Sequence, residues 1–231
     1  LIMAADSMNL ISNNGAEMQA GGYADLRADN GDIVFGTAAI ATDLIANGPD
    51  NSGGNDGYVY VEASQDVIQT AGSLSYMTSN RASVSVLAGR DIQIDPIWAN
   101  TFVDLAAGDD VTITGDVTAN NGYIYIRSDY DGTGAGNVDI TGAGTDILAN
   151  DGDGGGDGVI WMLGEDVNIG AGTTITADGS DIDGDITPGR EFGIAVLAQD
   201  DITYDGTLTA TGGSIYMYAD ALLGGQVAVL V

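Results

Sequence analysis

The sequence predicts an all-β chain that folds as a parallel β-helix, a solenoid with three short strands per coil and about nine coils. Three observations predict this fold. Phrases that alternate apolar and polar residues recur along the 231 residues, they recur in a fixed order of three, and turn formers separate them, since the chain has 36 glycines and only 3 prolines. Short repeats that bury a face only against their neighbours are typical of solenoids.

The first phrase of each cycle is an alternating strand that ends in a small residue. One face of this strand is entirely apolar, as a period of two requires when one side is buried. The sequence therefore predicts seven stacked strands whose inward pairs are Val59/Val61, Val84/Val86, Val103/Leu105, Ile124/Ile126, Ile160/Met162, Ile194/Val196 and Ile215/Met217.

The second phrase is a polar turn residue followed by two apolar positions spaced by two. Aspartate opens most copies, but serine, asparagine and glutamine replace it in three. All three substitutes form hydrogen bonds and carry no charge, so we expect the side chain to cap backbone N–H groups at a corner rather than to bind cations. The opening residues are Ser7, Asp32, Asp66, Asp91, Asp110, Asn137, Asp166, Asp201 and Gln226.

The third phrase places an apolar residue two before a small one and then turns, as at Glu17, Asp43, Asp116, Asp146, Thr174 and Thr207. Counting the second phrase gives nine cycles, and the shortest runs 19 residues from Asp91 to Asp110. Three strands in so few residues fit one coil of a parallel β-helix. An antiparallel sandwich or barrel is the rival fold, but it does not predict a fixed order of three phrases.

The composition restricts the partners. Five arginines and no lysine stand against 34 acidic residues, a formal charge of −29, which argues against binding nucleic acid or an anionic membrane surface. No apolar stretch reaches the roughly 18 to 20 residues that span a bilayer, so no membrane insertion is expected. The absence of cysteine fits an exported protein held together by a hydrogen-bonded sheet.

We expect one β-solenoid domain over residues 1–231. Neither end of the sequence shows an amphipathic helix or a polar cap, and a solenoid must cover its terminal coils. The chain is therefore expected to be a segment of a longer rod or a subunit that stacks end to end with copies of itself.

Two aspartate-rich loops follow the third strand in consecutive coils and should lie side by side. Flexible loops rich in carboxylates suit Ca²⁺, which takes six to eight oxygen ligands, so Ca²⁺ is the one cofactor that the sequence suggests. Solvated turns are the alternative interpretation. The candidate ligands are Asp151, Asp153, Asp157, Asp178, Asp181, Asp183 and Asp185.

Outward positions of the first strand carry aromatic residues. Exposed rings can stack on sugars or form a protein contact, although aromatic residues also favour strands on half-exposed sheets. We take them as a candidate binding surface for a glycan or a host-surface receptor, made of Tyr58, Tyr60, Tyr123, Tyr125, Trp161, Tyr216 and Tyr218.

Catalysis is not expected. The chain has neither histidine nor lysine, so acid/base chemistry would fall on carboxylates. The carboxylate pairs in "GDD" (Gly108 to Asp110) and "QDD" (Gln199 to Asp201) lie at the repeating corner, where capping explains them.

The segments "AGDDVTITGDVTANNG" (Ala107 to Gly122) and "AQDDITYDGTLTATGG" (Ala198 to Gly213) resemble the repeat regions of filamentous haemagglutinin-type adhesins exported by two-partner secretion. This resemblance implies a right-handed parallel β-helix at the cell surface or outside the cell. It implies a non-catalytic, rod-like adhesin segment that mediates attachment. The alternative function is a filament subunit that polymerises head to tail, and a polysaccharide-degrading β-helix enzyme is a weaker third interpretation.

Overall fold

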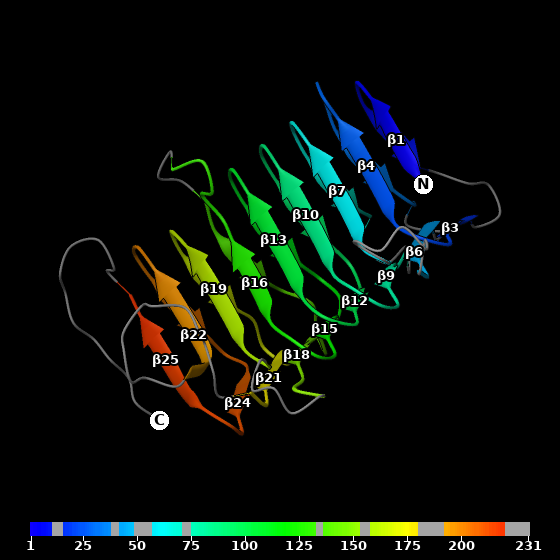
Figure 1. Cartoon of the computed structure of the whole chain (residues 1–231). Coiled ribbons are helices and arrows are strands. Elements are labelled where there is room, and N and C mark those ends of the chain that lie inside the picture. The colour runs from blue at the N-terminus through cyan, green and yellow to red at the C-terminus, as the bar shows by residue number, and fades with distance from the viewer. Residues whose placement is uncertain are drawn as a thin grey trace.

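The computed structural model of the chain is a stack of parallel β-strands in three sheets. It describes residues 1–10, 16–37, 42–48, 57–70, 75–132, 136–152, 158–179 and 192–219. Successive strands along the chain go to the first, second and third sheet in turn, so three strands make one coil. Figure 1 shows the strands of the first sheet side by side from β1 to β25. The predicted parallel β-helix is confirmed, and its predicted right-handedness stays a prediction.

The first sheet has nine strands: β1 (Ile2–Ala5), β4 (Ala24–Ala28), β7 (Val59–Ala63), β10 (Val84–Ala88), β13 (Val103–Ala107), β16 (Ile124–Arg127), β19 (Ile160–Gly164), β22 (Phe192–Ala198) and β25 (Ser214–Tyr218). We call it the nine-stranded sheet. It contains all seven strands of the predicted first phrase, together with β1 and β4, which that phrase did not include.

The other two sheets have eight strands each over the described residues. The second is formed by β2 (Met8–Leu10), β5 (Ile33–Phe35), β8 (Val67–Gln69), β11 (Ile92–Ile94), β14 (Val111–Ile113), β17 (Val138–Ile140), β20 (Val167–Ile169) and β23 (Ile202–Tyr204). The third is formed by β3 (Ala16–Ala20), β6 (Thr42–Ala46), β9 (Met77–Ser79), β12 (Ile97–Ala99), β15 (Val117–Ala119), β18 (Asp146–Ala149), β21 (Thr174–Ala177) and β24 (Thr207–Ala210). The phrase at Gln226 lies outside the described residues.

Equivalent residues of neighbouring coils lie directly over one another. Val84 of β10 pairs with Val59 on one side and with Val103 on the other, and both pairings are parallel. The inward residues Val61, Val86, Leu105 and Ile126 are 0% exposed. Because the strands of the inner coils bury alternate residues in this way, the core runs as an apolar column through them, while β1 and β23 to β25 in the outermost described coils contain no fully buried residue.

Two strands of the third sheet, β9 and β12, are not among the copies of the third phrase named from the sequence, although both follow its spacing. Ser79 occupies the inward small position of β9. This buried hydroxyl donates to the carbonyl oxygen of Gly57, which satisfies it without water. A similar exception is Gln69, which is fully buried and donates from Nε2 to the Ser75 carbonyl oxygen at 2.9 Å.

The aspartates that open the second phrase cap the next coil, as predicted. Each side chain accepts a hydrogen bond from the backbone N–H of the equivalent residue one coil further on, so the caps form a continuous ladder along one corner. Asn137 serves in the same way as the carboxylates. The distances from the donating backbone nitrogen, given first, to the accepting side-chain oxygen are 3.2 Å for Asp66 to Asp32, 3.3 Å for Asp91 to Asp66, 3.2 Å for Asp110 to Asp91, 2.8 Å for Asn137 to Asp110, 3.3 Å for Asp166 to Asn137 and 2.9 Å for Asp201 to Asp166.

Within the part of the chain that the structure describes, no helix could cross a membrane.

Candidate binding surface

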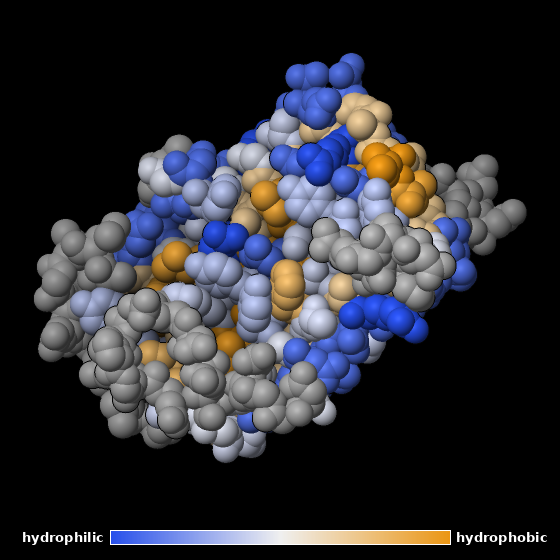
Figure 2. All heavy atoms as spheres, viewed as in Figure 1, coloured by the Kyte–Doolittle hydropathy of each residue, from blue (hydrophilic) through white to orange (hydrophobic). Residues whose placement is uncertain are grey.

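The outward face of the nine-stranded sheet carries the predicted aromatic surface. Tyr60, Tyr125, Trp161, Tyr216 and Tyr218 point outward from their strands, while Tyr58 and Tyr123 directly precede β7 and β16. All seven are at least partly exposed. Figure 2 shows hydrophilic and hydrophobic side chains interspersed over the molecule in this view, rather than one large apolar patch. The face is therefore mixed in character, as expected for a surface that contacts polar ligands.

Parallel register stacks the rings of neighbouring coils in three pairs, while Phe192 and Tyr216 are tilted by 42° and Tyr216 and Tyr218 lie on the same strand. Because equivalent positions of neighbouring coils are one strand spacing apart, an aromatic residue in consecutive coils stacks on its neighbour. All five ring contacts between described residues lie on this face. The ring centroids are 4.9 Å apart in Tyr23–Tyr58 and Phe102–Tyr123, 5.1 Å in Tyr125–Trp161 and Phe192–Tyr216, and 6.2 Å in Tyr216–Tyr218.

The sequence interpretation missed three of these rings, namely Tyr23, Phe102 and Phe192. Phe102 stands in the first phrase "FVDLAA" at the same position as Tyr58 and Tyr123, so comparing that column across all coils could have found it. Tyr23 was missed because β4 was not counted among the first-phrase strands. Phe192 lies at a register shift between β22 and β25, which no repeat pattern indicates.

Two arginines on this face contact both the aromatic rings and neighbouring carboxylates. Arg27 donates to Asp25 at 2.9 Å, pairs with Glu62 at 3.5 Å, and lies over the Tyr60 ring with 5.1 Å to its centroid. Burial raises the pKa of the Tyr60 phenol to about 12, helped by the hydrogen bond that its hydroxyl donates to Glu62 at 3.0 Å. Tyr60 is therefore a neutral hydrogen-bonding group at physiological pH.

The second arginine, Arg127, lies near the middle of the face, on β16. It donates to Asp104 at 3.1 Å and lies over two rings, 4.5 Å from the centroid of Tyr125 and 4.9 Å from that of Tyr130. Burial also raises the pKa of Tyr123 and of Tyr125. The cation–π contacts and the ion pair orient these side chains before any ligand arrives.

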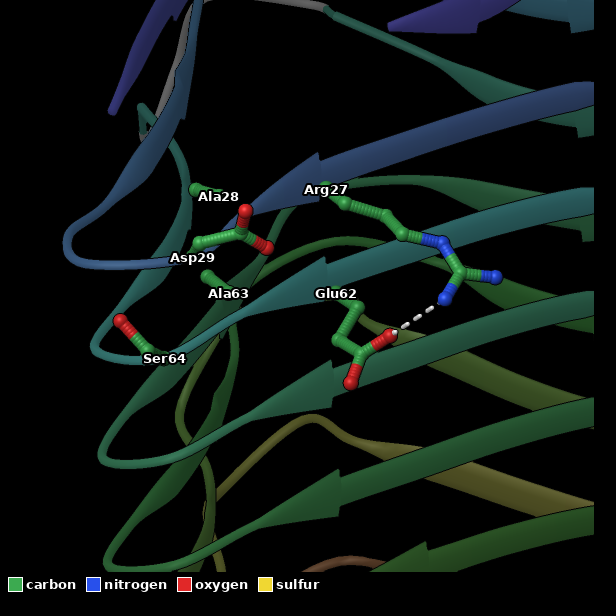
Figure 3. A pocket seen from close by; sticks show the side chains of 6 residues that line it. All are labelled: Arg27, Ala28, Asp29, Glu62, Ala63 and Ser64. Atoms are coloured by element: carbon green, nitrogen blue, oxygen red, sulfur yellow. Dashed lines mark ion pairs between the residues drawn. The ribbon is translucent and has the colours of Figure 1, made fainter. Parts of the chain in front are cut away.

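A shallow pocket of about 200 Å³ lies where β4 and β7 end. Arg27, Ala28, Asp29, Glu62, Ala63 and Ser64 line it, and Figure 3 shows Arg27 and Glu62 pointing toward one another from adjacent strands while Asp29 and Ser64 lie on the following turns. The pocket is polar, and its one cation is paired with acid. It extends the aromatic face toward the corner that carries the aspartate ladder.

The two predicted calcium loops meet at the residues where they can be described. The backbone N–H of Asp151 donates to the Asp178 carboxylate, and the Gly179 N–H donates to the Gly158 carbonyl oxygen at 2.8 Å, so the loops begin side by side as predicted. Asp153, Asp157, Asp181, Asp183 and Asp185 lie outside the described residues. The described residues alone contain no group of three acidic side chains that could hold a metal ion, and the calcium site stays a prediction.

One member of each carboxylate pair considered for catalysis, Asp110 and Asp201, stands at a rung position of the capping ladder. Asp110 accepts the N–H of Asn137 at 2.8 Å, and the N–H of Asp201 donates to Asp166 at 2.9 Å. Asp110 therefore has a structural partner within the fold.

Taken together, the three parallel sheets, the apolar column and the capping ladder define a parallel β-helix repeat protein. No protein-family model matches the chain, and neither the curated proteins nor the solved structures searched contain a match. Its architecture is thus established by its own repeat, and its function is inferred from the surface that the repeat displays.

Proposed function

We propose that this chain is a non-catalytic structural rod of the cell surface or extracellular space, an adhesin segment similar to the filamentous haemagglutinin-type repeats. It attaches through the outward face of the nine-stranded sheet. The single observation that carries this proposal is the gathering of all five described ring contacts on that face, together with two arginine–carboxylate pairs.

Three features support attachment rather than a purely structural role. Rings placed outward bury less apolar area in this chain than rings in its core, so the fold gains less from them. Aromatic and arginine side chains contribute most to binding when they are held rigidly, and here each ring has a stacked or cationic neighbour. A straight stack of parallel strands repeats the same kind of contact along its length, which favours multivalent attachment to an extended surface.

Attachment can be measured directly. The full chain, immobilised on beads, is expected to bind polysaccharide-coated or cell surfaces, and the double variant Tyr125→Ser/Trp161→Ser is expected to lose most of that binding. Trp98→Ser, an outward aromatic of the third sheet, is the matched control and is expected to bind as the wild type does. Equal loss in both variants, or no attachment by the wild-type chain, would overturn the proposal.

A second candidate function is head-to-tail filament assembly, and the outermost described coils favour it. Met3, Leu10 and Met18 at one end, and Ile202, Leu208, Ile215 and Met217 at the other, pack against the core but are only partly buried. A further coil would cover each set, and it can come from continuation of the chain or from a second copy. In the second case the contact does not close and a filament grows.

Light scattering distinguishes the two candidates. A filament subunit is expected to show a particle mass that grows with concentration, and it should lose assembly when a charged residue replaces an end position, as in Ile215→Asp. A monodisperse monomer at high concentration, with both native termini verified, would eliminate the filament function and leave attachment intact.

A further inference from the structure

The aromatic column of the nine-stranded sheet is interrupted at the β10 coil, where Ser83 directly precedes the strand and Ser85 occupies its first outward position. The backbone places Ser83 between two aromatic positions, since its carbonyl oxygen accepts the Val59 N–H at 2.9 Å and the Val84 N–H donates to the Phe102 carbonyl oxygen at 3.0 Å. One position further along, Ser85 pairs with Tyr60 on one side and with Asp104 on the other. We call the space above Ser83 and Ser85 the β10 gap.

Three rings stand beside this gap: Tyr58 and Phe102 lie on either side of Ser83, and Tyr60 lies beside Ser85. Tyr58 stacks on Tyr23, on the side away from β10, with centroids 4.9 Å apart. Phe102 stacks on Tyr123, on the side away from β10, with centroids 4.9 Å apart and planes within 5°. Tyr60 is covered by the Arg27 guanidinium on its side away from β10. The opposite faces of the Phe102 and Tyr60 rings are directed toward the β10 coil, where the serine side chains are short.

The size of the gap follows from the register. β7 and β13 are two strand spacings apart, about 9.6 Å, which leaves room for one ring at the separation found in the stacked pairs of this face. Phe102 and Tyr60 are offset by two residues along the strand direction, about 6.6 Å. A ligand that lies along β10 would therefore contact Phe102 above Ser83 and Tyr60 above Ser85.

The polar groups around the gap are numerous, and its carboxylates are paired with arginines. The hydroxyls of Ser83 and Ser85 form its floor, and the carboxylates of Glu62 and Asp104 stand on opposite sides. Each carboxylate is paired with an arginine, Glu62 with Arg27 at 3.5 Å and Asp104 with Arg127 at 3.1 Å. Because Arg27 also pairs with Asp25, these ion-paired groups carry one net negative charge and offer both hydrogen-bond donors and acceptors.

This combination fits a sugar ring. A pyranose has an apolar C–H face that stacks on an aromatic ring and a rim of hydroxyls that need donors and acceptors. An anionic sugar would meet a chain of charge −29, and Arg27 and Arg127 beside the gap are already paired with carboxylates. We propose that the β10 gap binds the pyranose rings of a neutral glycan. This inference rests on the proposed function, because it names the ligand class of the attachment face.

Filling the gap tests the inference without weakening the fold. Ser83→Phe restores the missing ring, which is expected to stack on Phe102 and to maintain or raise the melting temperature. Neutral oligosaccharides built from glucose, mannose or galactose are titrated into the full chain by calorimetry, and a galacturonate oligosaccharide serves as the anionic comparison. We expect the wild type to bind at least one neutral series, and Ser83→Phe to weaken that binding at least about tenfold.

Thr112→Phe is the matched control, because it adds the same ring at an outward position of β14 in the second sheet. It is expected to leave saccharide affinity unchanged. Phe102→Leu keeps an apolar side chain but removes the stacking face, and it is expected to weaken binding as Ser83→Phe does.

Three results would overturn the inference: no neutral saccharide binds, Ser83→Phe binds as tightly as the wild type, or the galacturonate series binds better than every neutral one. The proposed function is judged separately by bead attachment. If Ser83→Phe beads attach as the wild type does, the β10 gap is not the glycan site although the face still mediates attachment. If wild-type beads do not attach at all, the proposed function itself fails.

Discussion

At the scale of single residues, the aspartate ladder shows how a column of like charges can be stable. Carboxylates about 4.8 Å apart repel by roughly 1 kcal/mol per pair in water-like surroundings. A hydrogen bond from a backbone N–H to a charged acceptor contributes about 1.5–3 kcal/mol, so capping outweighs the repulsion. Arg90 further reduces the charge repulsion at one rung, because its guanidinium donates to Asp66 and lowers the pKa of that carboxyl.

The acceptor, rather than the charge, is what each rung needs. We expect Asp110→Ala to lower the free energy of unfolding by about 1–3 kcal/mol, because the Asn137 N–H loses its partner. Asp110→Asn is expected to change it by less than about 1 kcal/mol, as Asn137 already serves as a rung. Urea unfolding measures both, with Asp109→Asn as a control for the charge change. Equal losses for Ala and Asn would contradict this account.

The partly exposed rung at Asp91 makes stability depend on pH. Burial is the largest cause that raises the pKa of Asp91, and the nearby carboxylates Asp66, Asp110 and Asp109 add to it. A folded-state pKa above the unfolded value of about 3.9 contributes stability that is fully present below that value and is lost as pH rises through the folded pKa. Asp91→Asn keeps the acceptor, so it is expected to raise the melting temperature at pH 7 but not at pH 3. An equal rise in melting temperature at pH 7 and pH 3 would contradict this pH dependence.

At the scale of the elements, the turns after β10 and β13 bring neighbouring coils into close backbone contact. A Cβ atom on Gly89 would lie 2.1 Å from the Ser64 carbonyl oxygen, and one on Gly108 would lie 2.2 Å from the Gly89 carbonyl oxygen. Backbone therefore contacts backbone from coil to coil at this turn. Glycine is required here by close approach, and only the stacking of the coils reveals it.

Substitution at this turn tests the close approach. Gly108→Ala is expected to lower the free energy of unfolding by about 2 kcal/mol or more, because backbone must move to admit the methyl group. Gly21→Ala has open space around its Cβ position and is expected to be neutral or to stabilise by up to about 1 kcal/mol. Thermal and urea unfolding of the two variants make the comparison. Similar stabilities of the Gly108→Ala and Gly21→Ala variants would mean that the backbone of the turn shifts at little energetic cost.

At the scale of the whole molecule, the dominant feature is the charge of −29 on a slender stack of coils. Only four arginines lie among the described residues, and three of them are paired with acids. The remaining carboxylates repel one another over distances that salt screens, since the Debye length is about 8 Å at physiological ionic strength. The folded rod is therefore expected to be more stable in a saline or calcium-rich medium.

Comparing different cations distinguishes general charge screening from binding at a specific calcium site. The melting temperature is expected to rise with added sodium chloride, and to rise further with millimolar Ca²⁺ than with Mg²⁺ at equal ionic strength if the loops that begin at Asp151 and Asp178 bind calcium. Differential scanning calorimetry at fixed pH measures both effects. Equal responses to the two divalent ions would leave the aspartates as turn formers, and indifference to salt would contradict the electrostatic account.

Much of this architecture could be predicted from the sequence, because a period of two and a turn after each strand are local properties. Val86 and Leu105 are inward for the same reason in every coil, and the substitution of Asn137 for aspartate was enough to predict a cap. The candidate aromatic face followed in the same way, since Tyr60 and Tyr125 occupy outward positions of the same phrase.

The sequence by itself determined the coil, its apolar column and its capping corner, since each follows from residues within a single repeat. Only the tertiary structure decided which side chains meet across coils: Arg127 with Asp104, Arg27 with Glu62 and Tyr60, Phe102 with Tyr123, and the two serines of β10 between rings. These contacts depend on how coils of 19 to 35 residues are brought into register. Register is set by hydrogen bonds between residues far apart in the chain, and the pattern within one repeat does not predict these bonds.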